Sequence, residues 1–278
     1  MRISRVGIVV KPGSDQASEA ARDITAFLQG KGVETFPFLS PVKGSGSGQR
    51  RAERKADLLV VVGGDGTVMR AAEHSADVPI LGVKIGALGF LCETTPDRAN
   101  ASLGKILAGE YFLEHKSKLK VSYGKKVLPD ALNEALVCTS KPSKVMSLMV
   151  TKDGEPLHKG RADGVIVSTT TGSTAYALSA GGPIIDSRLD IMEIVFMCPL
   201  AAGLKPLILP SSSKVEVTVL PDDPPGMLVI DGQISVDLDF GKPVAVERSD
   251  KDAIFVRVSR PDFYRRVREK LKTGLEVL

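Results

Sequence analysis

The sequence predicts an α/β N-terminal domain with a Rossmann-like parallel sheet, followed by an all-β, sandwich-like C-terminal domain. From residue 1 to about 110, short apolar runs alternate with amphipathic stretches, as strands and covering helices do in a parallel sheet. From about Tyr111, apolar and polar residues alternate one by one, which is typical of half-exposed antiparallel strands. A last helical pattern returns to the first domain. We therefore expect one domain at 1–112 plus 258–278 and a second at 113–257.

The expected elements follow from these two periodicities. The first domain contains predicted strands at 6–10, 33–36, 58–62 and 78–83 and predicted helices at 14–30 and 97–107. Residues 41–49, rich in Gly and Ser, indicate a mobile surface loop or a flexible linker. The second domain contains predicted strands at 118–122, 165–167, 214–219, 235–240 and 243–247. A final helix begins at Pro261-Asp262 and ends at Gly274.

Composition is that of an ordinary globular protein. The net charge of +4 suits a polyanionic nucleotide but is too small and dispersed to indicate DNA or RNA binding. No run approaches the roughly 18 apolar residues of a membrane span, and no signal peptide is visible. The three cysteines and three histidines do not cluster, so we expect reduced, buried thiols, no protein-built metal site and a cytoplasmic location.

The first candidate site is Gly63-Gly64-Asp65-Gly66-Thr67, which joins a buried strand to a helix. Glycine lets a backbone approach a phosphate closely, and the N-terminus of a helix favours negative charge. A carboxylate in such a turn repels phosphate unless it holds a metal or takes a proton from an attacking hydroxyl group. The alternative is an ordinary β-turn in which Asp65 caps the next helix.

Three further stretches contain polar residues that packing does not require. Asn133-Glu134 precedes an apolar run and is, taken alone, most often a turn or rim. Residues 161–184 begin with Arg161-Ala162-Asp163-Gly164 and include a hydroxyl-rich segment that offers donors and acceptors to ribose, amide or phosphate groups, or that caps a helix near Thr174. Asp231-Gly232-Gln233 lies between apolar strands, where Asp-Gly is a strong hairpin signal.

Together, in this order, the motifs GGDGT, LGFL, Asn-Glu, TGSTAYALSAGGPI and DGQ resemble those of the NAD kinase family. GGDGT also occurs in diacylglycerol and sphingosine kinases, whereas the TGSTAYALSAGGPI stretch is specific. The resemblance implies transfer of a phosphoryl group from ATP, or from polyphosphate, to the 2′-hydroxyl of the adenosine ribose of NAD. It also implies a homodimer or homotetramer, with Mg²⁺ carried in on the donor phosphates because no carboxylate cage is present.

The resemblance also implies roles for individual residues. Asp65 would be the general base, with Gly66 beside the substrate, while Gly63, Gly64 and Thr67 shape the phosphate side. Phe90 would stack in the NAD pocket, Asn133 and Glu134 would hold ribose hydroxyls, and Asp163 would bond the nicotinamide amide. Arg161 would approach a bound NAD from the same or a neighbouring subunit. The other candidate binding residues are Arg70, Lys144, Thr171, Thr174, Ala175, Tyr176, Ala177, Leu178, Ser179 and Gln233.

Three positions depart from the family pattern. Lys84 replaces the usual Asn and could contact a phosphate, although we favour a solvated lysine at a strand end. Thr170 replaces a Pro that would stiffen the turn. Lys205 replaces a common Arg and lacks its bidentate fork, which puts a phosphate contact in doubt.

Two alternative functions stay open. One is a lipid or sphingoid kinase of the same design, which would need an apolar acyl pocket. The other is a non-catalytic NAD(P)-binding regulator that reuses the kinase pocket.

Overall fold

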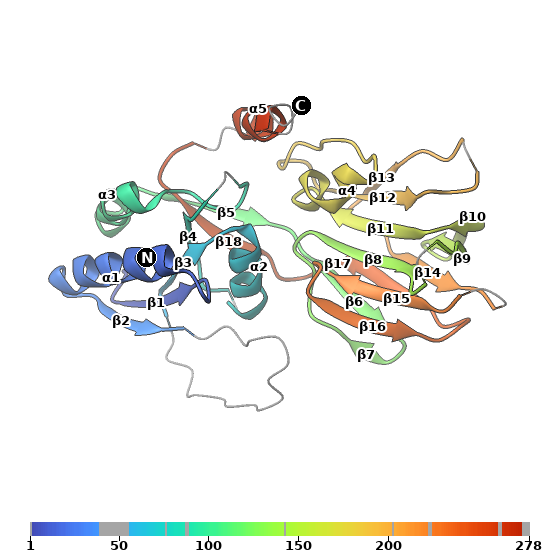
Figure 1. Ribbon diagram of the computed structural model, residues 1–278, viewed down its shortest axis with the longest axis horizontal. Helices are drawn as coiled ribbons and strands as arrows, with labels where there is room; N and C mark the ends of the chain where they lie inside the picture. The colour runs from blue at the N-terminus through green and yellow to red at the C-terminus, as the bar shows by residue number, and fades with distance from the viewer. Residues whose placement is uncertain are drawn as a thin grey trace. The chain divides into compact units, whose positions relative to one another are not determined.

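The chain divides into two compact units, Met1–His115 with Ala253–Leu278, and Lys116–Asp252 (Figure 1). The computed structural model describes residues 2–38, 56–75, 77–86, 89–141, 143–201, 203–221, 224–260 and 263–273, so the predicted loop at 41–49 lies outside the described residues. The first unit is α/β and the second is built from antiparallel sheets, which confirms the predicted fold class.

A six-stranded sheet forms the centre of the first unit, in the order β2-β1-β3-β4-β18-β5. Its strands are β1 (Arg5–Val10), β2 (Glu34–Pro37), β3 (Leu58–Gly63), β4 (Ile80–Lys84), β5 (Phe112–Lys116) and β18 (Ala253–Arg257). The pairs among β1, β2, β3, β4 and β18 are parallel, and β3 is buried along its whole length. The sequence placed the residues of β18 in the β-rich domain, whereas they complete this sheet.

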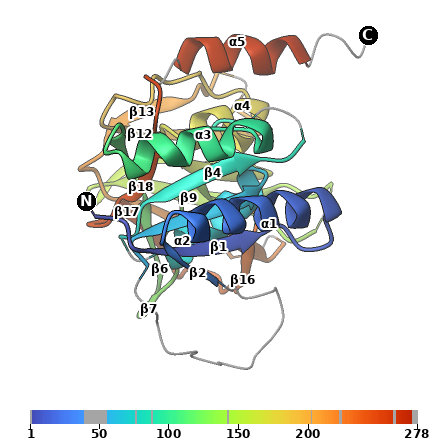
Figure 2. The ribbon, with the colours of Figure 1, turned by 90° about the vertical axis from the view of Figure 1, so that its left-hand side faces the viewer.

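Helices cover the two faces of this sheet. Side chains of α1 (Asp15–Gly30) and α3 (Pro96–Leu107) pack with Leu58, Val60 and Val62, which share one face of β3 because alternate residues of a strand point the same way. Figure 2 shows these two helices in front of the sheet, and α2 (Asp65–His74) lies on its other side. The last helix, α5 (Phe263–Thr273), belongs to the same unit and follows β18.

The second unit is a sandwich of two six-stranded sheets whose paired strands are antiparallel. One sheet has the order β10-β9-β14-β17-β6-β7: β6 (Leu119–Tyr123), β7 (Lys126–Val127), β9 (Met146–Lys152), β10 (Glu155–Ala162), β14 (Val215–Val219) and β17 (Val244–Arg248). The other has the order β13-β12-β11-β8-β15-β16: β8 (Glu134–Thr139), β11 (Gly164–Thr169), β12 (Ile191–Met197), β13 (Leu207–Pro210), β15 (Gly226–Ile230) and β16 (Ile234–Leu238).

One apolar core fills the sandwich and draws alternate residues from both sheets. The outer face of the second sheet carries a 3₁₀ turn (Gly172–Thr174) and a single-turn helix, α4 (Tyr176–Ser179), which packs Ala177 on Ile166 and Val195. The helix expected near Thr174 is therefore only these two short pieces.

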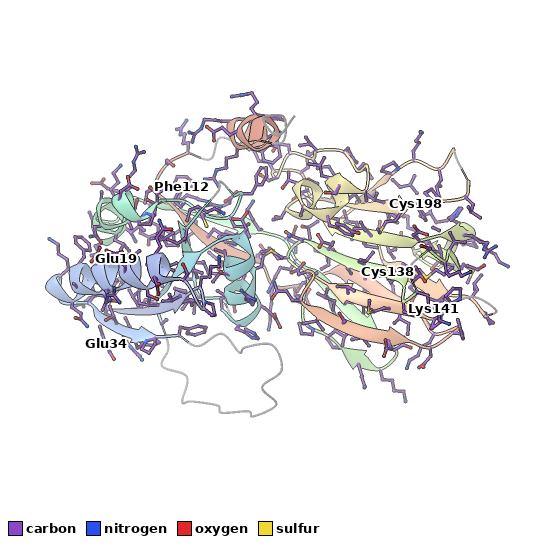
Figure 3. All side chains as sticks on the ribbon, in the orientation of Figure 1. Glu19, Glu34, Phe112, Cys138, Lys141 and Cys198 are labelled. Atoms are coloured by element: carbon purple, nitrogen blue, oxygen red, sulfur yellow. The ribbon has the colours of Figure 1, made fainter. Side chains whose placement is uncertain are left out.

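The cysteines do not all match the expectation of buried thiols. Cys92 is buried, and burial, with the nearby Asp65 charge, raises the pKa of its thiol to about 12. Cys138 on β8 is half-buried, and Cys198 in the loop after β12 is exposed, which makes the expectation wrong for Cys198 (Figure 3). None of the described helices is long and apolar enough to cross a membrane.

Candidate active site

Asp65 is the first residue of α2, and two backbone N–H groups hold its carboxylate. The N–H of Phe90 donates to Oδ2 at 2.8 Å, and the N–H of Leu91 donates more weakly to Oδ1 at 3.4 Å. Gly64, not Asp65, is the N-cap residue of α2, and the Asp65 carboxylate is bonded to residues 90 and 91 instead. The reading of Asp65 as a simple helix cap is therefore wrong. Its side chain is 29% exposed, so the carboxylate is fixed and still open to a substrate.

Lys84 lies at the end of β4 beside this carboxylate. Its Nζ atom is 4.0 Å from Oδ1 of Asp65, and its side chain is only 14% exposed. The preference for a solvated lysine is therefore wrong. An added Cβ at Gly64 would lie 3.7 Å from the same Nζ atom, so the ammonium group is directed at the glycine turn. At this position the positive charge can serve both the carboxylate and an incoming phosphate.

Gly63, in the 63–67 turn, and Gly89, just before Phe90, each allow another side chain to approach the backbone closely. A Cβ atom on Gly63 would meet the buried Thr67 side chain at 2.6 Å, so the end of β3 can pack on α2 only without a side chain. A Cβ atom on Gly89 would overlap the carboxylate of Asp65. Gly66 and Arg70 are exposed on α2. The two glycines therefore let the Thr67 and Asp65 side chains approach the backbone closely.

A second polar cluster, in the other unit, is centred on Asp231. Its carboxylate accepts N–H groups from Leu132, Asn133 and Glu134 at 2.7, 2.8 and 3.0 Å. Asp231 and Gly232 have φ of 49° and 66°, and the N–H of Gln233 donates to the Ile230 carbonyl at 2.9 Å. These are the features of a type I′ hairpin turn, so the hairpin reading is confirmed. The same turn also fixes the backbone of the Asn-Glu motif.

The hydroxyl-rich segment is joined to the same backbone. Thr169 Oγ1 donates to the Leu132 carbonyl at 2.7 Å, and Ser168 Oγ donates to the Asn133 carbonyl at 3.2 Å. Gly172 lies so close to the Asn133 carbonyl that a Cβ atom would overlap it. Residues 168–174 are all buried, and Thr169, Ser173 and Thr174 bond to the backbone around them. Much of this run is therefore structural and shapes the segment that leads into α4.

A row of polar side chains crosses the sheet under this segment. Ser168 on β11 pairs in register with Glu134 on β8 and with Glu193 on β12, so the three side chains share one face. Glu193 is 0% exposed, and in the described structure neither of its carboxyl oxygens has a hydrogen-bond partner. Burial raises the pKa of Glu193 to about 7. Burial and the charge of Asp231 raise the pKa of Glu134 to about 8.

The other candidate residues of the second unit differ in exposure and lie on different elements. Arg161 is exposed at the end of β10, and Asp163 is half-buried between β10 and β11. Lys144 is exposed in the connection between β8 and β9, whereas the Asn-Glu motif lies at the start of β8. On α4, Ala177 is buried, Leu178 is half-buried, and Tyr176 and Ser179 are exposed, whereas Ala175, just before α4, is half-buried.

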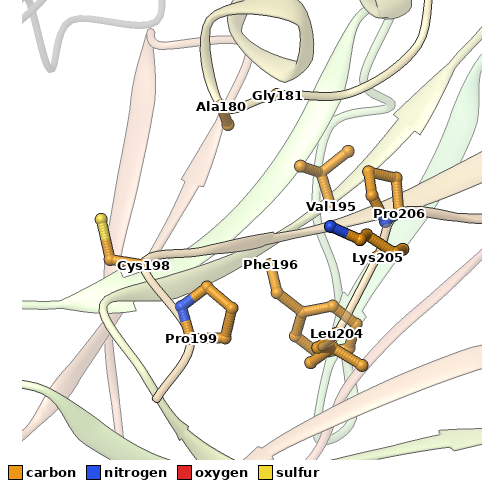
Figure 4. Close-up of a pocket in the computed structure, with 9 residues that line it drawn as sticks. All are labelled: Ala180, Gly181, Val195, Phe196, Cys198, Pro199, Leu204, Lys205 and Pro206. Atoms are coloured by element: carbon orange, nitrogen blue, oxygen red, sulfur yellow. The ribbon is translucent and has the colours of Figure 1, made fainter. Parts of the chain in front are cut away.

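Lys205 lines a cavity of about 320 Å³ beside α4 (Figure 4). The cavity walls come from the turn that follows α4, from β12 and from the loop after it: Ala180, Gly181, Val195, Phe196, Cys198, Pro199, Leu204 and Pro206. Lys205 brings the positive charge to this lining. Thr170, the other departure, is buried, and its carbonyl accepts the Ser173 hydroxyl at 2.8 Å, so the turn is fixed without a proline.

The supporting roles of several residues were missed by sequence reasoning. Glu193 had a visible signal, because it interrupts the apolar run Ile191–Met197. Asp231 had only a turn signal, and its role depends on residues about 100 positions away. Arg257 and Arg266 had no signal in the sequence, since isolated arginines on a strand and a helix are common.

Comparison with known proteins identifies both parts of the chain. Residues 43–111 match the family model of the ATP-NAD kinase N-terminal domain, and residues 132–258 match that of the C-terminal domain. The chain is 37% identical to an NAD kinase of Methanothermobacter thermautotrophicus over 276 residues, which is 97% of each chain. It is 38% identical to an NAD kinase of Thermococcus gammatolerans, over 96% of this chain and 99% of that one.

Solved structures agree in fold over almost the whole chain. An NAD kinase from Archaeoglobus fulgidus in complex with ATP superposes with a TM-score of 0.81 at 29% identity, covering 95% of this chain and 99% of that one. The yeast NADH kinase complexed with NADH gives a TM-score of 0.86 at 26% identity, covering 98% and 88%. With matched motifs, matched domain models and relatives of the same length, the chain belongs to the NAD kinase family.

Proposed function

We propose that this chain transfers the terminal phosphoryl group of ATP to the 2′-hydroxyl of the adenosine ribose of NAD, forming NADP, with Asp65 as the general base. The observation that carries this assignment is the placement of Asp65. Its carboxylate is partly exposed at the N-terminus of a helix, and backbone N–H groups orient it from behind. A secondary hydroxyl is a poor nucleophile, so a carboxylate fixed in this way is suited to take its proton.

The surrounding groups suit the donor side of the reaction. The glycine turn and the first turn of α2 present backbone N–H groups, and Lys84 adds a positive charge 4.0 Å from the base. A transferring phosphoryl group carries charge on its outer oxygens, which such donors stabilise. Lys84 therefore contributes a positive charge to donor binding, which the usual Asn at this position would not.

Mg²⁺ enters this proposal as part of the donor. Among the described residues, no group of three or more His, Cys, Asp or Glu side chains could hold a metal. One carboxylate beside a lysine fits an ion that is bound chiefly by phosphate oxygens and water. The ion would neutralise charge on the donor phosphates, while Asp65 orients and deprotonates the acceptor.

The acceptor side is assigned to the second unit. Asn133 and Glu134 are fixed by Asp231, and a rigid backbone there would present their side chains to the ribose hydroxyls of NAD. Asp163, Arg161, Tyr176 and Phe90 keep the NAD-contact roles that the family resemblance implies. A homodimer or homotetramer, which the family resemblance implies, and a cytoplasmic location complete the proposal.

One assay separates this function from its alternatives. Purified protein is incubated with NAD, Mg²⁺ and either ATP or polyphosphate, and NADP is measured. Formation of NADP with ATP is the expected result. Tight NAD binding without NADP from either donor would favour a non-catalytic regulator, and phosphorylation of a sphingoid base or diacylglycerol in place of NAD would favour a lipid kinase.

The Asp65→Asn variant tests the base itself. Turnover is expected to fall by at least about 100-fold while NAD binding is retained, as for the loss of a general base. Asp97→Asn is a matched control, because Asp97 is also in the first turn of a helix of the same unit but is 73% exposed. Equal losses of NAD affinity and turnover in Asp65→Asn would show that the carboxylate is structural.

A further inference from the structure

A buried charge network links the C-terminal helix to the residues that hold Asp65. The guanidinium of Arg266, on α5, donates from Nη1 to the Phe90 carbonyl at 2.6 Å. Arg257, at the end of β18, donates from Nη1 to the Leu91 carbonyl at 3.0 Å. The N–H groups of the same two residues, Phe90 and Leu91, are the donors to the Asp65 carboxylate.

One peptide group carries both contacts. The carbonyl of Phe90 and the N–H of Leu91 belong to the same planar peptide unit, so their directions are coupled. Arg266 binds the oxygen end of this unit, and Asp65 binds its N–H end. A cation on the oxygen increases the polarity of the N–H bond that faces the carboxylate. The helix also holds the Phe90 ring, whose centroid is 6.3 Å from that of Phe263.

Two glutamates fix the arginines. Oε2 of Glu93 lies 3.4 Å from Arg257 Nη1 and 3.4 Å from Arg266 Nη2, and the Glu93 side chain is only 1% exposed. Oε1 of the same carboxylate accepts the N–H groups of Val258 and Ser259 and the Ser259 hydroxyl. Glu114 on β5 accepts from Arg257 Nε at 2.7 Å. The charges are balanced and strongly bonded, so the arginines have little freedom to move.

We propose that Arg266 is a positioning residue for the reaction and that, supported by Arg257 and Glu93, it fixes the 90–91 peptide and through it the catalytic carboxylate of Asp65. This inference rests on the proposed function, because it gives Arg266 a role through Asp65. It makes α5, which carries none of the family motifs quoted above, part of the active-site support.

The test compares Arg266→Met with Arg265→Met. The two arginines are neighbours on α5, but Arg265 is 58% exposed and pairs with Glu269 on the helix surface. Arg257 is not suitable, because removing a side chain that is 2% exposed would leave buried charges without partners. Arg266→Met is expected to lower kcat about tenfold with the KM for NAD nearly unchanged, and Arg266→Lys to recover part of the loss. Arg265→Met is expected to keep the wild-type kcat.

Two further readouts exclude a merely structural role. Amide hydrogen exchange of the peptide around residues 89–93 is expected to be faster in Arg266→Met than in Arg265→Met. In the Asp65→Asn background, Arg266→Met is expected to have little additional effect on kcat, since a residue that acts through Asp65 has nothing left to position. The inference is overturned if kcat and exchange in Arg266→Met equal those of Arg265→Met, or if its tenfold loss persists in full with Asp65→Asn.

Failure of the proposed function has a different signature. If Asp65→Asn keeps wild-type turnover, the base assignment fails whatever Arg266 does, and the inferred catalytic role of Arg266 fails with it. If Asp65→Asn loses turnover while the Arg266 and Arg265 variants behave alike, only the inference fails.

Discussion

Replacing Glu193 with Gln should remove a pH-dependent loss of stability from the second unit. Glu193 is fully buried on the same face of β12 as Val195, and burial raises the pKa of its carboxyl group from 4.5 to about 7. Because the folded state holds the proton more tightly than the unfolded state, the neutral acid favours folding. Its contribution is complete below pH 4.5 and is lost as the pH rises to about 7.

The size of the effect follows from this difference in proton affinity. A pKa raised from 4.5 to about 7 corresponds to a penalty on the order of 3 kcal/mol at pH 8, at about 1.4 kcal/mol for each tenfold change in affinity. For a chain of this size, 3 kcal/mol corresponds to a melting-temperature change of about 5–10 °C. Gln has nearly the same shape and carries no charge at any pH, so it should avoid the penalty.

Thermal unfolding of wild type and Glu193→Gln at pH 5 and pH 8 measures this directly. We expect the two proteins to melt within a few degrees of each other at pH 5, and the variant to melt about 5–10 °C higher at pH 8. Glu155→Gln is the matched control, since Glu155 is an exposed glutamate in the same unit. A difference between Glu193→Gln and wild type that does not change between the two pH values would refute the reasoning.

Two further predictions concern the supports of the candidate site. Asp231→Asn keeps a residue that tolerates positive φ but replaces one carboxylate oxygen by an NH₂ group, so the hydrogen bonds to residues 132–134 should weaken. We expect the free energy of unfolding to fall by about 1–3 kcal/mol and NAD binding to weaken. Urea unfolding and NAD titration measure these two effects, and unchanged values would contradict the role of Asp231 in fixing residues 132–134. Gly89→Ala should lower kcat by at least about tenfold, because its Cβ atom would displace the Asp65 carboxylate, whereas Gly30→Ala, where no atom lies within 4 Å, should retain full activity in the same assay.

The elements and the chemistry of the motifs were predictable from local sequence. An uninterrupted apolar run such as Leu58–Gly63 predicts a buried strand, and a glycine turn followed by helical spacing predicts the start of α2. The one-by-one alternation in Val215–Val219 gives an exposed and a buried face, and the structure has that pattern. These features depend on neighbours within a few residues, so reading the chain in order recovers them.

Side-chain environments were less predictable, because they depend on where the chain returns. Lys84 looks like a solvated residue at a strand end, yet only 14% of its side chain is exposed and its Nζ atom lies 4.0 Å from the Asp65 carboxylate. The hydroxyl run at 168–174 looks like a ligand-binding surface, yet several of its members satisfy backbone groups of residues 132–133. In both cases the residue type indicated a polar role, but the sequence did not indicate which residues it would contact.

The same separation between motif and support recurs in both parts of the candidate site. The Asp65 carboxylate is held by residues 90–91, whose carbonyls are held by arginines more than 160 positions further along the chain. The Asn133–Glu134 backbone is held by Asp231, nearly 100 positions away. Short-range patterns therefore specify the groups that do the chemistry, and distant residues set their geometry. Because a displacement of about 1 Å can cost about 100-fold in rate, a family member could keep every motif and still lose most of its activity through these supports.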